Sequence, residues 1–429
     1  MLKKCKELVS RYKKHFLDMI LIVATSFISK MVSLLVLMYV ARSIGGVDFG
    51  KYQTLLVTLT LFSSAIQGSL SLYATKFIAS TELQGEGSVS QVVWTSYIGA
   101  IVLGFVTFGL AFGSANWLAI SWLGDTALAP LIKLAAVTLI FGPLAGVQSG
   151  ILAGSSNYRT SALLSAAAPL FSAPVFIYLS LHYGVDGTVA ALMLQSLIAC
   201  LMGEFLIVRT GLRGRKTLKL HLLGQNLKEF IRFCAPTSIS GFVIAPANWY
   251  ATVLIVALPN GYLEMAAYGV ANQWKQAILF IPTALSSYVT SHLSRSSNDR
   301  DRYDRVFKIS VAVAMSSGLL SAMLICLLST YIMKQYLIEL NEGWLVLCVA
   351  SVSAAIVSVN NMYSRSAASL GRAWLFLGYE VIWAFSFIVM SIVVVERYGS
   401  LGVAIAALLA AGVQLFFQVF VWNALKSRK

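Results

Sequence analysis

The sequence predicts an all-α polytopic membrane protein with twelve transmembrane helices in two parallel six-helix halves. Of its 429 residues, 58% are hydrophobic and 11% are charged, whereas soluble domains are nearer half apolar and a quarter charged. The mean hydropathy is +0.79. Apolar runs of about 20 residues, the length that crosses a bilayer, recur along the chain. These observations exclude a soluble enzyme, a disordered chain and a collagen-like chain.

The apolar runs give the expected helices in order. In the first half we expect helices near residues 18–41, 50–74, 91–112, 129–153, 160–182 and 187–208. In the second half we expect them near residues 233–257, 265–292, 307–333, 344–364, 373–395 and 400–424. None of these runs has the ten-residue alternating pattern that a membrane β-barrel requires.

The positions of the basic residues predict the orientation. The net charge is +15, but the basic residues lie between the apolar runs and not among stacking aromatics, so nucleic acid is not an expected partner. With the N-terminus placed inside, 25 of the 32 Lys and Arg residues fall inside, four fall outside and three lie within spans. Basic residues near span ends stay cytoplasmic. Both termini are therefore expected in the cytoplasm.

Internal similarity predicts that the halves are repeats. The expected parts are a basic cytoplasmic tail, a six-helix bundle, a basic cytoplasmic linker and a second bundle, over residues 1–17, 18–208, 209–232 and 233–429. Tyr183–Gly187 resembles Tyr398–Gly402 at an offset of 215, and Gly150–Gly154 resembles Ala367–Gly371 at an offset of 217. Chance likeness of glycine-containing loops is the alternative. An even number of helices in each half makes the repeats parallel, as in some transporters.

Two lysines lie deep inside predicted spans, Lys30 in the first and Lys275 in the eighth. An ionisable residue there costs ~3 kcal/mol or more and normally faces a bundle interior or water. One interpretation is an anion-binding cavity between the two halves. The other is that each lysine pairs with an acid such as Glu380, or lies nearer an interface. A cavity lined by lysines favours anionic cargo such as a phosphate or an acidic sugar.

Further polar residues extend this candidate site. Lys133 lies near the outer end of the fourth span, where it either joins the cavity or extends to the interface. Glu380 is the candidate for proton relay or cation coupling. Six other side chains are expected to line the cavity: Ser26, Ser33, Gln67, Asn248, Asn272 and Gln276. Ser and Thr residues in spans more often bond between helices than bind ligands.

The sequence predicts no enzyme activity, no metal site and no cofactor beyond proton or sodium coupling. Its five cysteines include no CxxC pair, and no His/Cys cluster has metal-ligand spacing. The four histidines are scattered and form no acid–base constellation. A membrane-embedded polymerase or ligase usually carries a large periplasmic catalytic loop, whereas the longest predicted outside loop here covers only residues 113–128.

Several short motifs resemble the polysaccharide transporter family of the multidrug/oligosaccharidyl-lipid/polysaccharide exporter superfamily. Ala41–Gly45 followed by Gly50–Tyr52 is similar to the family's loop after the first helix. Gly150–Gly154 and Tyr183–Gly187 are similar to later landmarks, and Ala267–Gly269 with Ile281–Leu285 is similar to the family's eighth helix. Within the superfamily, the chain looks like the Wzx-type O-antigen flippases, with a fold like that of multidrug exporters.

The resemblance implies a function. Such proteins move an undecaprenyl-pyrophosphate-linked oligosaccharide, such as an O-antigen repeat unit for lipopolysaccharide, from the cytoplasmic to the periplasmic leaflet of the bacterial cytoplasmic membrane. Relatives line a cationic cavity with basic residues of helices one and eight, a role that Lys30 and Lys275 inherit, with Arg42 at the outer mouth. Partnership with a polymerase and a chain-length regulator is implied as well. The alternative is a cation-coupled multidrug exporter of the same fold, in which acids would line the cavity.

Overall fold

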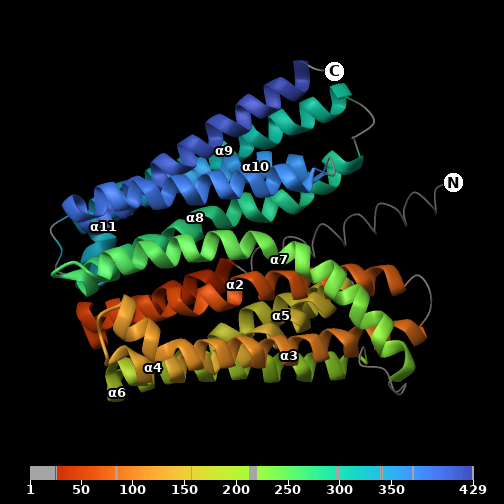
Figure 1. Cartoon of the computed structure of the whole chain (residues 1–429), viewed down its shortest axis with the longest axis horizontal. Coiled ribbons are helices and arrows are strands. Elements are labelled where there is room, and N and C mark those ends of the chain that lie inside the picture. Colours follow the sequence, from red (N-terminus) through yellow and green to blue (C-terminus); the bar gives the residue numbers. More distant parts are fainter. Residues whose placement is uncertain are drawn as a thin grey trace. The chain divides into compact units, whose positions relative to one another are not determined.

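The computed structural model is all-helical over the residues that it describes, which are 25, 27–82, 86–155, 157–211, 220–295, 300–338, 340, 342–369 and 372–427 (Figure 1). A helix over Phe27–Ile44 comes first. The elements that follow are α2 (Gly46–Glu82), α3 (Glu86–Trp117), the π-helical turn η1 (Leu118–Trp122), α4 (Leu128–Ala136), α5 (Thr138–Gly154), α6 (Tyr158–Arg209), α7 (Leu220–Val256), α8 (Gly261–Arg295), α9 (Arg300–Gln335), α10 (Gly343–Ser369) and α11 (Ala373–Ser427). The predicted tail over residues 1–17, Ser26 and residues 212–219 of the predicted linker lie outside the described residues.

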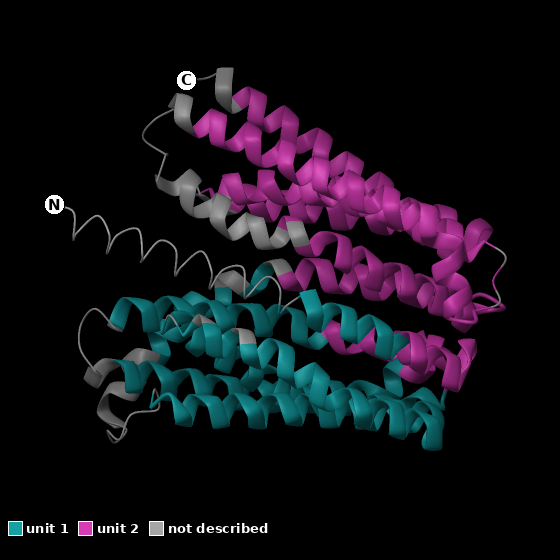
Figure 2. Cartoon of the chain, turned by 180° about the vertical axis from the view of Figure 1, so that it is seen from behind, with its two compact units in different colours: residues 1–37, 62–118, 126–239 teal, residues 38–61, 119–125, 240–429 magenta. Residues whose placement is uncertain are grey.

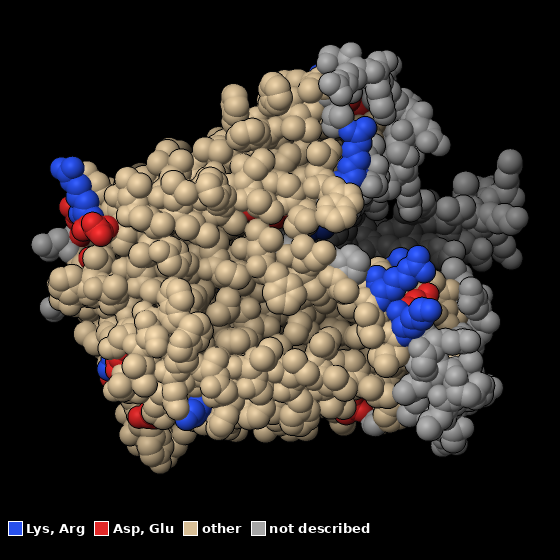
Figure 3. Space-filling model, in the orientation of Figure 1, with Lys and Arg blue, Asp and Glu red and all other residues tan. Residues whose placement is uncertain are grey.

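The composition of these helices makes the chain a multi-pass membrane protein. Within the described residues, eight helical segments are long and apolar enough to cross a membrane, and those over Arg159–Arg209 and Trp374–Ala424 have 51 residues each. A single span needs only about 20 residues. On the face drawn in Figure 3, most Lys, Arg, Asp and Glu side chains lie near helix ends, and uncharged side chains cover most of the rest.

Both long helices change direction at a glycine. The backbone leaves helical geometry at Gly184 (φ 57°, ψ −134°) in α6 and at Gly399 (φ 55°, ψ −132°) in α11. A positive φ costs glycine little but strains other residues. These two glycines are 215 residues apart and belong to the paired motifs of the sequence, which therefore mark the same turn in both places.

The starts of the helices repeat with nearly the same period. Gly46 of α2 and Gly261 of α8 are 215 residues apart, as are Tyr158 of α6 and Ala373 of α11. The starts of α3 and α9 are 214 residues apart. Local geometry repeats as well, since a Cβ on Gly187 would meet the Leu179 carbonyl, and one on Gly402 would meet the Val394 carbonyl. The spacing agrees with the period that the glycine motifs predict.

Two predicted loops are wrong. The outside loop expected over residues 113–128 is mostly helical, because α3 continues to Trp117 and the π-helical turn extends it to Trp122. The loop expected between residues 41 and 50 shrinks to a single break at Gly45, which has a φ of 84°. Polar and aromatic residues at a bilayer interface end the apolar run without ending the helix, so hydropathy underestimates helix length.

The described contacts divide the chain into two units (Figure 2). Unit 1 comprises residues 1–37, 62–118 and 126–239, and unit 2 comprises residues 38–61, 119–125 and 240–429. In unit 1, α5 contacts α3 and α6; in unit 2, α10 contacts α8, α9 and α11. The units follow contacts and not the two halves of the sequence, and the predicted division at residues 209–232 stays a prediction.

The Gly150–Gly154 motif has a packing role in unit 1. It places two glycines of α5 against the backbone of α2, where a Cβ on Gly150 would lie 2.5 Å from the Ser71 carbonyl oxygen. A Cβ on Gly154 would lie 2.8 Å from the Thr75 carbonyl oxygen. The Thr75 hydroxyl donates to the Gly150 carbonyl at 3.2 Å. Small residues four apart allow two membrane helices to approach this closely.

Candidate substrate-binding site

Lys30 is half-buried in unit 1, on the first described helix. One turn further on, the Ser33 hydroxyl donates to the Ser29 carbonyl at 2.9 Å, so this predicted lining residue is bonded to its own helix. Among the described residues, no carboxylate lies within ion-pair distance of the Lys30 ammonium. Pairing with an acid, one of the two interpretations of this residue, therefore has no support in that part of the chain.

Lys275 is half-buried in unit 2, on α8. Its Nζ lies 3.5 Å from the hydroxyl of Ser353, a fully buried residue of α10. An ammonium has three donors, and no described carboxylate pairs with this one. The contact with a neutral hydroxyl orients the side chain and leaves its positive charge available for an anion.

Glu380 does not neutralise either lysine. It is half-buried on α11, in the same unit as Lys275, and no described Lys or Arg lies within 4.0 Å of its carboxylate. Lys275 and Glu380 thus lie in the same unit without an ion pair between them. The role of Glu380 in coupling stays a prediction.

The other predicted cavity residues differ in their surroundings. Asn272 is half-buried and Gln276 is exposed on α8, while Gln67 is exposed on α2. The Asn248 amide donates to the Ile244 carbonyl of its own helix at 2.9 Å. Their sequence pattern predicted a polar stripe lining a cavity, and for Asn272 and Gln276 on α8 that role stays a prediction.

Two further basic residues have partners inside their own unit. The Arg42 guanidinium, which is exposed, donates to the backbone carbonyl and the side-chain oxygen of Gln335, at the end of α9. The Lys133 ammonium lies 5.6 Å from the ring centroid of Phe112, within range of a cation–π interaction. Arg42 therefore links two helices of unit 2, and the role of Lys133 stays a prediction.

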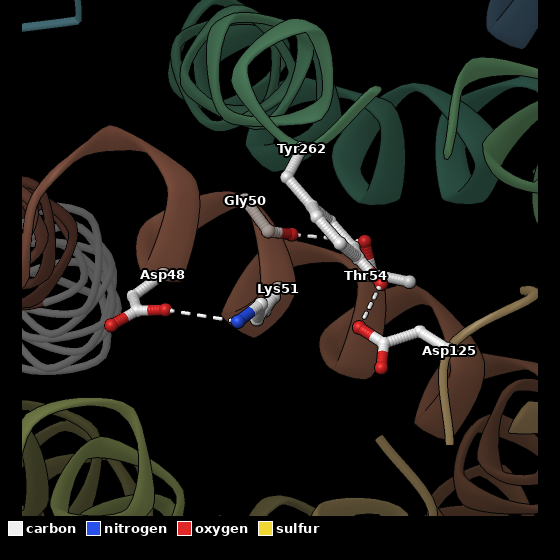
Figure 4. Close-up of polar contacts among 6 residues, drawn as sticks. All are labelled: Asp48, Gly50, Lys51, Thr54, Asp125 and Tyr262. Atoms are coloured by element: carbon white, nitrogen blue, oxygen red, sulfur yellow. Dashed lines mark hydrogen bonds and ion pairs between the residues drawn. The ribbon is translucent and has the colours of Figure 1, made fainter. Parts of the chain in front are cut away.

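A polar cluster that the sequence did not predict surrounds Tyr262, at the start of α8 (Figure 4). The Tyr262 hydroxyl donates to the Asp125 carboxylate at 2.7 Å. The Lys51 ammonium lies 3.3 Å from the Asp48 carboxylate and 5.7 Å from the centre of the Tyr262 ring. Together with Gly50 and Thr54, these residues form what we call the Tyr262 cluster.

Gly50 allows α2 and α8 to meet in this cluster. A Cβ at Gly50 would lie 1.8 Å from the Tyr262 carbonyl oxygen, which is a backbone atom and has little freedom to move. The Thr54 hydroxyl donates to the Gly50 carbonyl at 2.9 Å (Figure 4). Tyr262 follows Gly261 at a helix start and Asp125 follows Gly124, whose φ is 66°. Those glycines mark turns in the sequence, but they do not indicate which turns meet.

Aromatic contacts continue this zone of unit 2. The Trp122 and Trp249 rings lie 5.4 Å apart, and the Trp249 indole donates to the Thr58 hydroxyl at 3.3 Å. The ring centroids of Phe49 and Tyr336 are 6.3 Å apart. Residues 38–61 and 119–125 are therefore held to α7, α8 and α9 by polar and aromatic contacts. Trp122 is itself exposed, and one contact of its ring is with Trp249 in the same unit.

The fold is that of a membrane transporter of the multidrug-exporter and flippase type. The chain is similar to an inward-facing multidrug resistance MATE family transporter of the MOP superfamily, with a TM-score of 0.77, 16% identity, and coverage of 95% of this chain and 99% of that one. It is also similar to the lipid II flippase MurJ, with a TM-score of 0.75, 17% identity, and coverage of 94% and 87%. Identities this low show the fold alone.

Sequence comparison gives the family. The chain belongs to the polysaccharide biosynthesis protein family, whose model matches residues 17–291. It is 20% identical over 313 residues to the EPS I polysaccharide export inner membrane protein EpsE of Ralstonia nicotianae, covering 68% of each chain. The relative and the two structural neighbours are named as an export protein, a multidrug transporter and a lipid flippase. The chain is therefore a multi-pass membrane protein of this family, the kind of protein that the sequence motifs predicted.

Proposed function

We propose that this protein moves an undecaprenyl-pyrophosphate-linked oligosaccharide, such as an O-antigen repeat unit, from the cytoplasmic to the periplasmic leaflet of a bacterial inner membrane. The observation that carries the proposal is the pair of half-buried lysines, Lys30 and Lys275, neither of which has a carboxylate partner among the described residues. Family membership is the reason for proposing a glycan as the substrate, and the two lysines are the residues proposed to attract its pyrophosphate.

The physical basis is the strength of charge interactions in a poorly hydrated site. Two unit charges 4 Å apart interact by about 4 kcal/mol at an effective dielectric constant of 20, compared with about 1 kcal/mol in water. Lysine binds phosphate as a point charge, so it tolerates different sugars on the same carrier. The polar side chains of Asn272 and Gln276 would contact the glycan, and the polyprenyl tail would remain in lipid.

The proposed topology has twelve spans with both termini in the cytoplasm. The bends at Gly184 and Gly399 support it, because each divides a 51-residue apolar segment into two lengths that fit a bilayer. The excess of basic residues in the predicted inner loops supports the orientation. On this topology the Tyr262 cluster lies at the periplasmic end of unit 2. Its contacts would there block the exit of the substrate to the periplasm, and they would have to break before the substrate is released.

A cation-coupled multidrug exporter is the second candidate, which the MATE-like fold favours. The charge of the embedded residues distinguishes the two. Cationic drugs would be repelled by Lys30 and Lys275, whereas Glu380 alone would attract them. We also propose Glu380 as the place where a proton or sodium ion would couple to transport, and a polymerase and a chain-length regulator as partners that consume the exported unit.

A deletion strain tests the proposed function. Lipid-linked oligosaccharide in the inner membrane and polymeric glycan on the cell surface are measured in the same cells. Accumulation of lipid-linked single units together with loss of surface glycan is the expected result. Unchanged surface glycan with new sensitivity to cationic dyes would identify a drug exporter and overturn the proposal.

A further inference from the structure

A basic pocket lies in unit 1, between the last turns of α2 and residues 228–233 of α7. The cavity has a volume of about 490 Å³ and is lined by Phe77, Lys228, Glu229, Arg232 and Phe233. Figure 3 shows basic side chains, with an acidic one among them, gathered at this position on the face drawn. No residue of the pocket belongs to the predicted cavity, so the proposed function does not account for it.

Residues 227–234 of α7 present three different faces. Phe230 and Cys234 are buried in the core of unit 1. Leu227 and Ile231 are 36% and 57% exposed, as expected of apolar side chains that face lipid. Lys228 and Arg232 are exposed as well and line the pocket. Residues four apart lie on one face of a helix, so apolar and basic faces run side by side here, a pattern typical of a helix at the membrane interface.

Aromatic rings hold a third cation over the same pocket. The Lys76 ammonium of α2 lies 4.8 Å from the centre of the Phe233 ring and 5.4 Å from that of Phe77. Both rings also line the pocket and lie 5.6 Å apart, edge to face. Leu72, one turn before Lys76 on α2, is 56% exposed. Both helices therefore carry exposed apolar side chains within one turn of the residues that bear these cations.

The charges of the pocket are unbalanced. Among the described residues that line the pocket, Lys228 and Arg232 accompany a single carboxylate, Glu229, and Lys76 adds a third cation over the Phe233 ring. No ion pair within 4.0 Å joins Glu229 to these three residues, all of which are described. A net positive pocket between membrane helices beside exposed apolar side chains has the chemistry that recognises an anionic lipid headgroup. The cations contact the phosphate, and the apolar faces contact the acyl chains.

We propose that this pocket binds the phosphate of an anionic membrane lipid, with Lys76, Lys228 and Arg232 as ligands and Phe77 and Phe233 as its walls. On the topology proposed above, the lipid belongs to the inner leaflet. The site goes beyond the proposed function, because it depends on neither the glycan nor the embedded lysines. It would fix the α2–α7 contact of unit 1 to the membrane surface.

Native mass spectrometry of the purified full-length protein tests the proposal with three separate probes: phosphatidylglycerol, phosphatidylcholine and inorganic phosphate. The test variant combines Lys76→Gln, Lys228→Gln and Arg232→Gln, all at exposed positions. The matched control is Arg209→Gln, an equally exposed basic residue at the end of α6 that is not among the pocket's lining residues. Lys228→Gln alone serves as a milder second variant.

The expected result is one phosphatidylglycerol retained by the wild type and by Arg209→Gln, with at least tenfold weaker retention by the triple variant and an intermediate loss in Lys228→Gln. Retention of phosphatidylglycerol that is equal in all variants would overturn the proposal, as would equal retention of phosphatidylcholine. Full competition by inorganic phosphate would show that the pocket takes phosphate without a lipid, and would overturn the lipid source. None of these outcomes bears on glycan export, so the two proposals fail separately.

Discussion

The hydroxyl of Tyr262, at the start of α8, donates a 2.7 Å hydrogen bond to the carboxylate of Asp125, in the turn before α4. Burial, followed by this hydrogen bond, raises the pKa of Tyr262 above its ordinary value. The phenol therefore remains a neutral donor throughout the physiological range. The two residues are far apart in sequence, and their bond fastens residues 119–125 to the second half of the chain within unit 2.

Replacing Tyr262 with Phe keeps the ring that lies near Lys51 and removes only the hydrogen bond. We expect a loss of about 1–3 kcal/mol in unfolding free energy, because the half-buried Asp125 carboxylate loses its phenol donor. Thermal unfolding of the purified protein measures the change. Tyr331→Phe is the matched control, since Tyr331 is 65% exposed on α9. Equal unfolding temperatures for the two variants would show that the bond contributes nothing.

Gly50→Ala tests the close approach of α2 to α8. The new Cβ would lie 1.8 Å from a backbone oxygen of Tyr262, so the helices must separate. Overpacking of this kind costs typically about 1–3 kcal/mol. Gly68→Ala on the same helix meets no atom within 4 Å and should be neutral or stabilising, because alanine favours helix. Thermal unfolding that does not distinguish the two variants would contradict the observed packing.

Gly150→Leu tests the role of the glycine motif in unit 1. Already the Cβ of a larger residue would lie 2.5 Å from the Ser71 carbonyl oxygen. We expect the protein to lose folding yield in membranes, measured by fluorescence-detected size-exclusion chromatography. Gly142→Leu on the same helix, where a Cβ meets nothing within 4 Å, should keep a monodisperse peak. A normal peak from Gly150→Leu would mean that this motif does not set the distance between α2 and α5.

Ser353→Ala separates the charge of Lys275 from its hydrogen bond. The substitution removes the hydroxyl 3.5 Å from Nζ but leaves the ammonium in place. If Lys275 binds the substrate, export should fall by less than about threefold in Ser353→Ala and by at least tenfold in Lys275→Met. Surface glycan measured in complemented deletion cells gives the comparison. Equal loss in both variants would make Lys275 a structural residue.

Local chemistry decided which features could be predicted from the sequence. The bends at Gly184 and Gly399 could be predicted from the sequence, because glycine motifs mark positive φ values and the two motifs repeat at one offset. The embedded lysines could be predicted as well, because charged residues within apolar runs are easily identified. Their neighbours could not be predicted, since Ser353 meets Lys275 only through the packing of α8 on α10.

The Tyr262 cluster could not be predicted for the same reason. Asp125 and Tyr262 lie in separate turns, and neither has a local pattern that identifies its partner. The helix ends were misjudged at Trp117–Trp122 because hydropathy detects the apolar core and not the helical turns that extend beyond it. Arg42, expected as a ligand at the outer mouth, has Gln335 as its partner through a contact that links residues 293 positions apart.

The most direct test of the central claim is flipping by the purified protein in proteoliposomes. Undecaprenyl-pyrophosphate oligosaccharide is incorporated, and its appearance in the opposite leaflet is followed with a membrane-impermeant glycan-modifying enzyme. The wild type and Lys133→Ala should flip the lipid, whereas Lys30→Ala and Lys275→Ala should be at least tenfold slower although they are reconstituted equally. Lys30→Arg and Lys275→Arg should retain partial activity, since charge is kept and geometry changes. Flipping at the wild-type rate by both alanine variants would contradict the account.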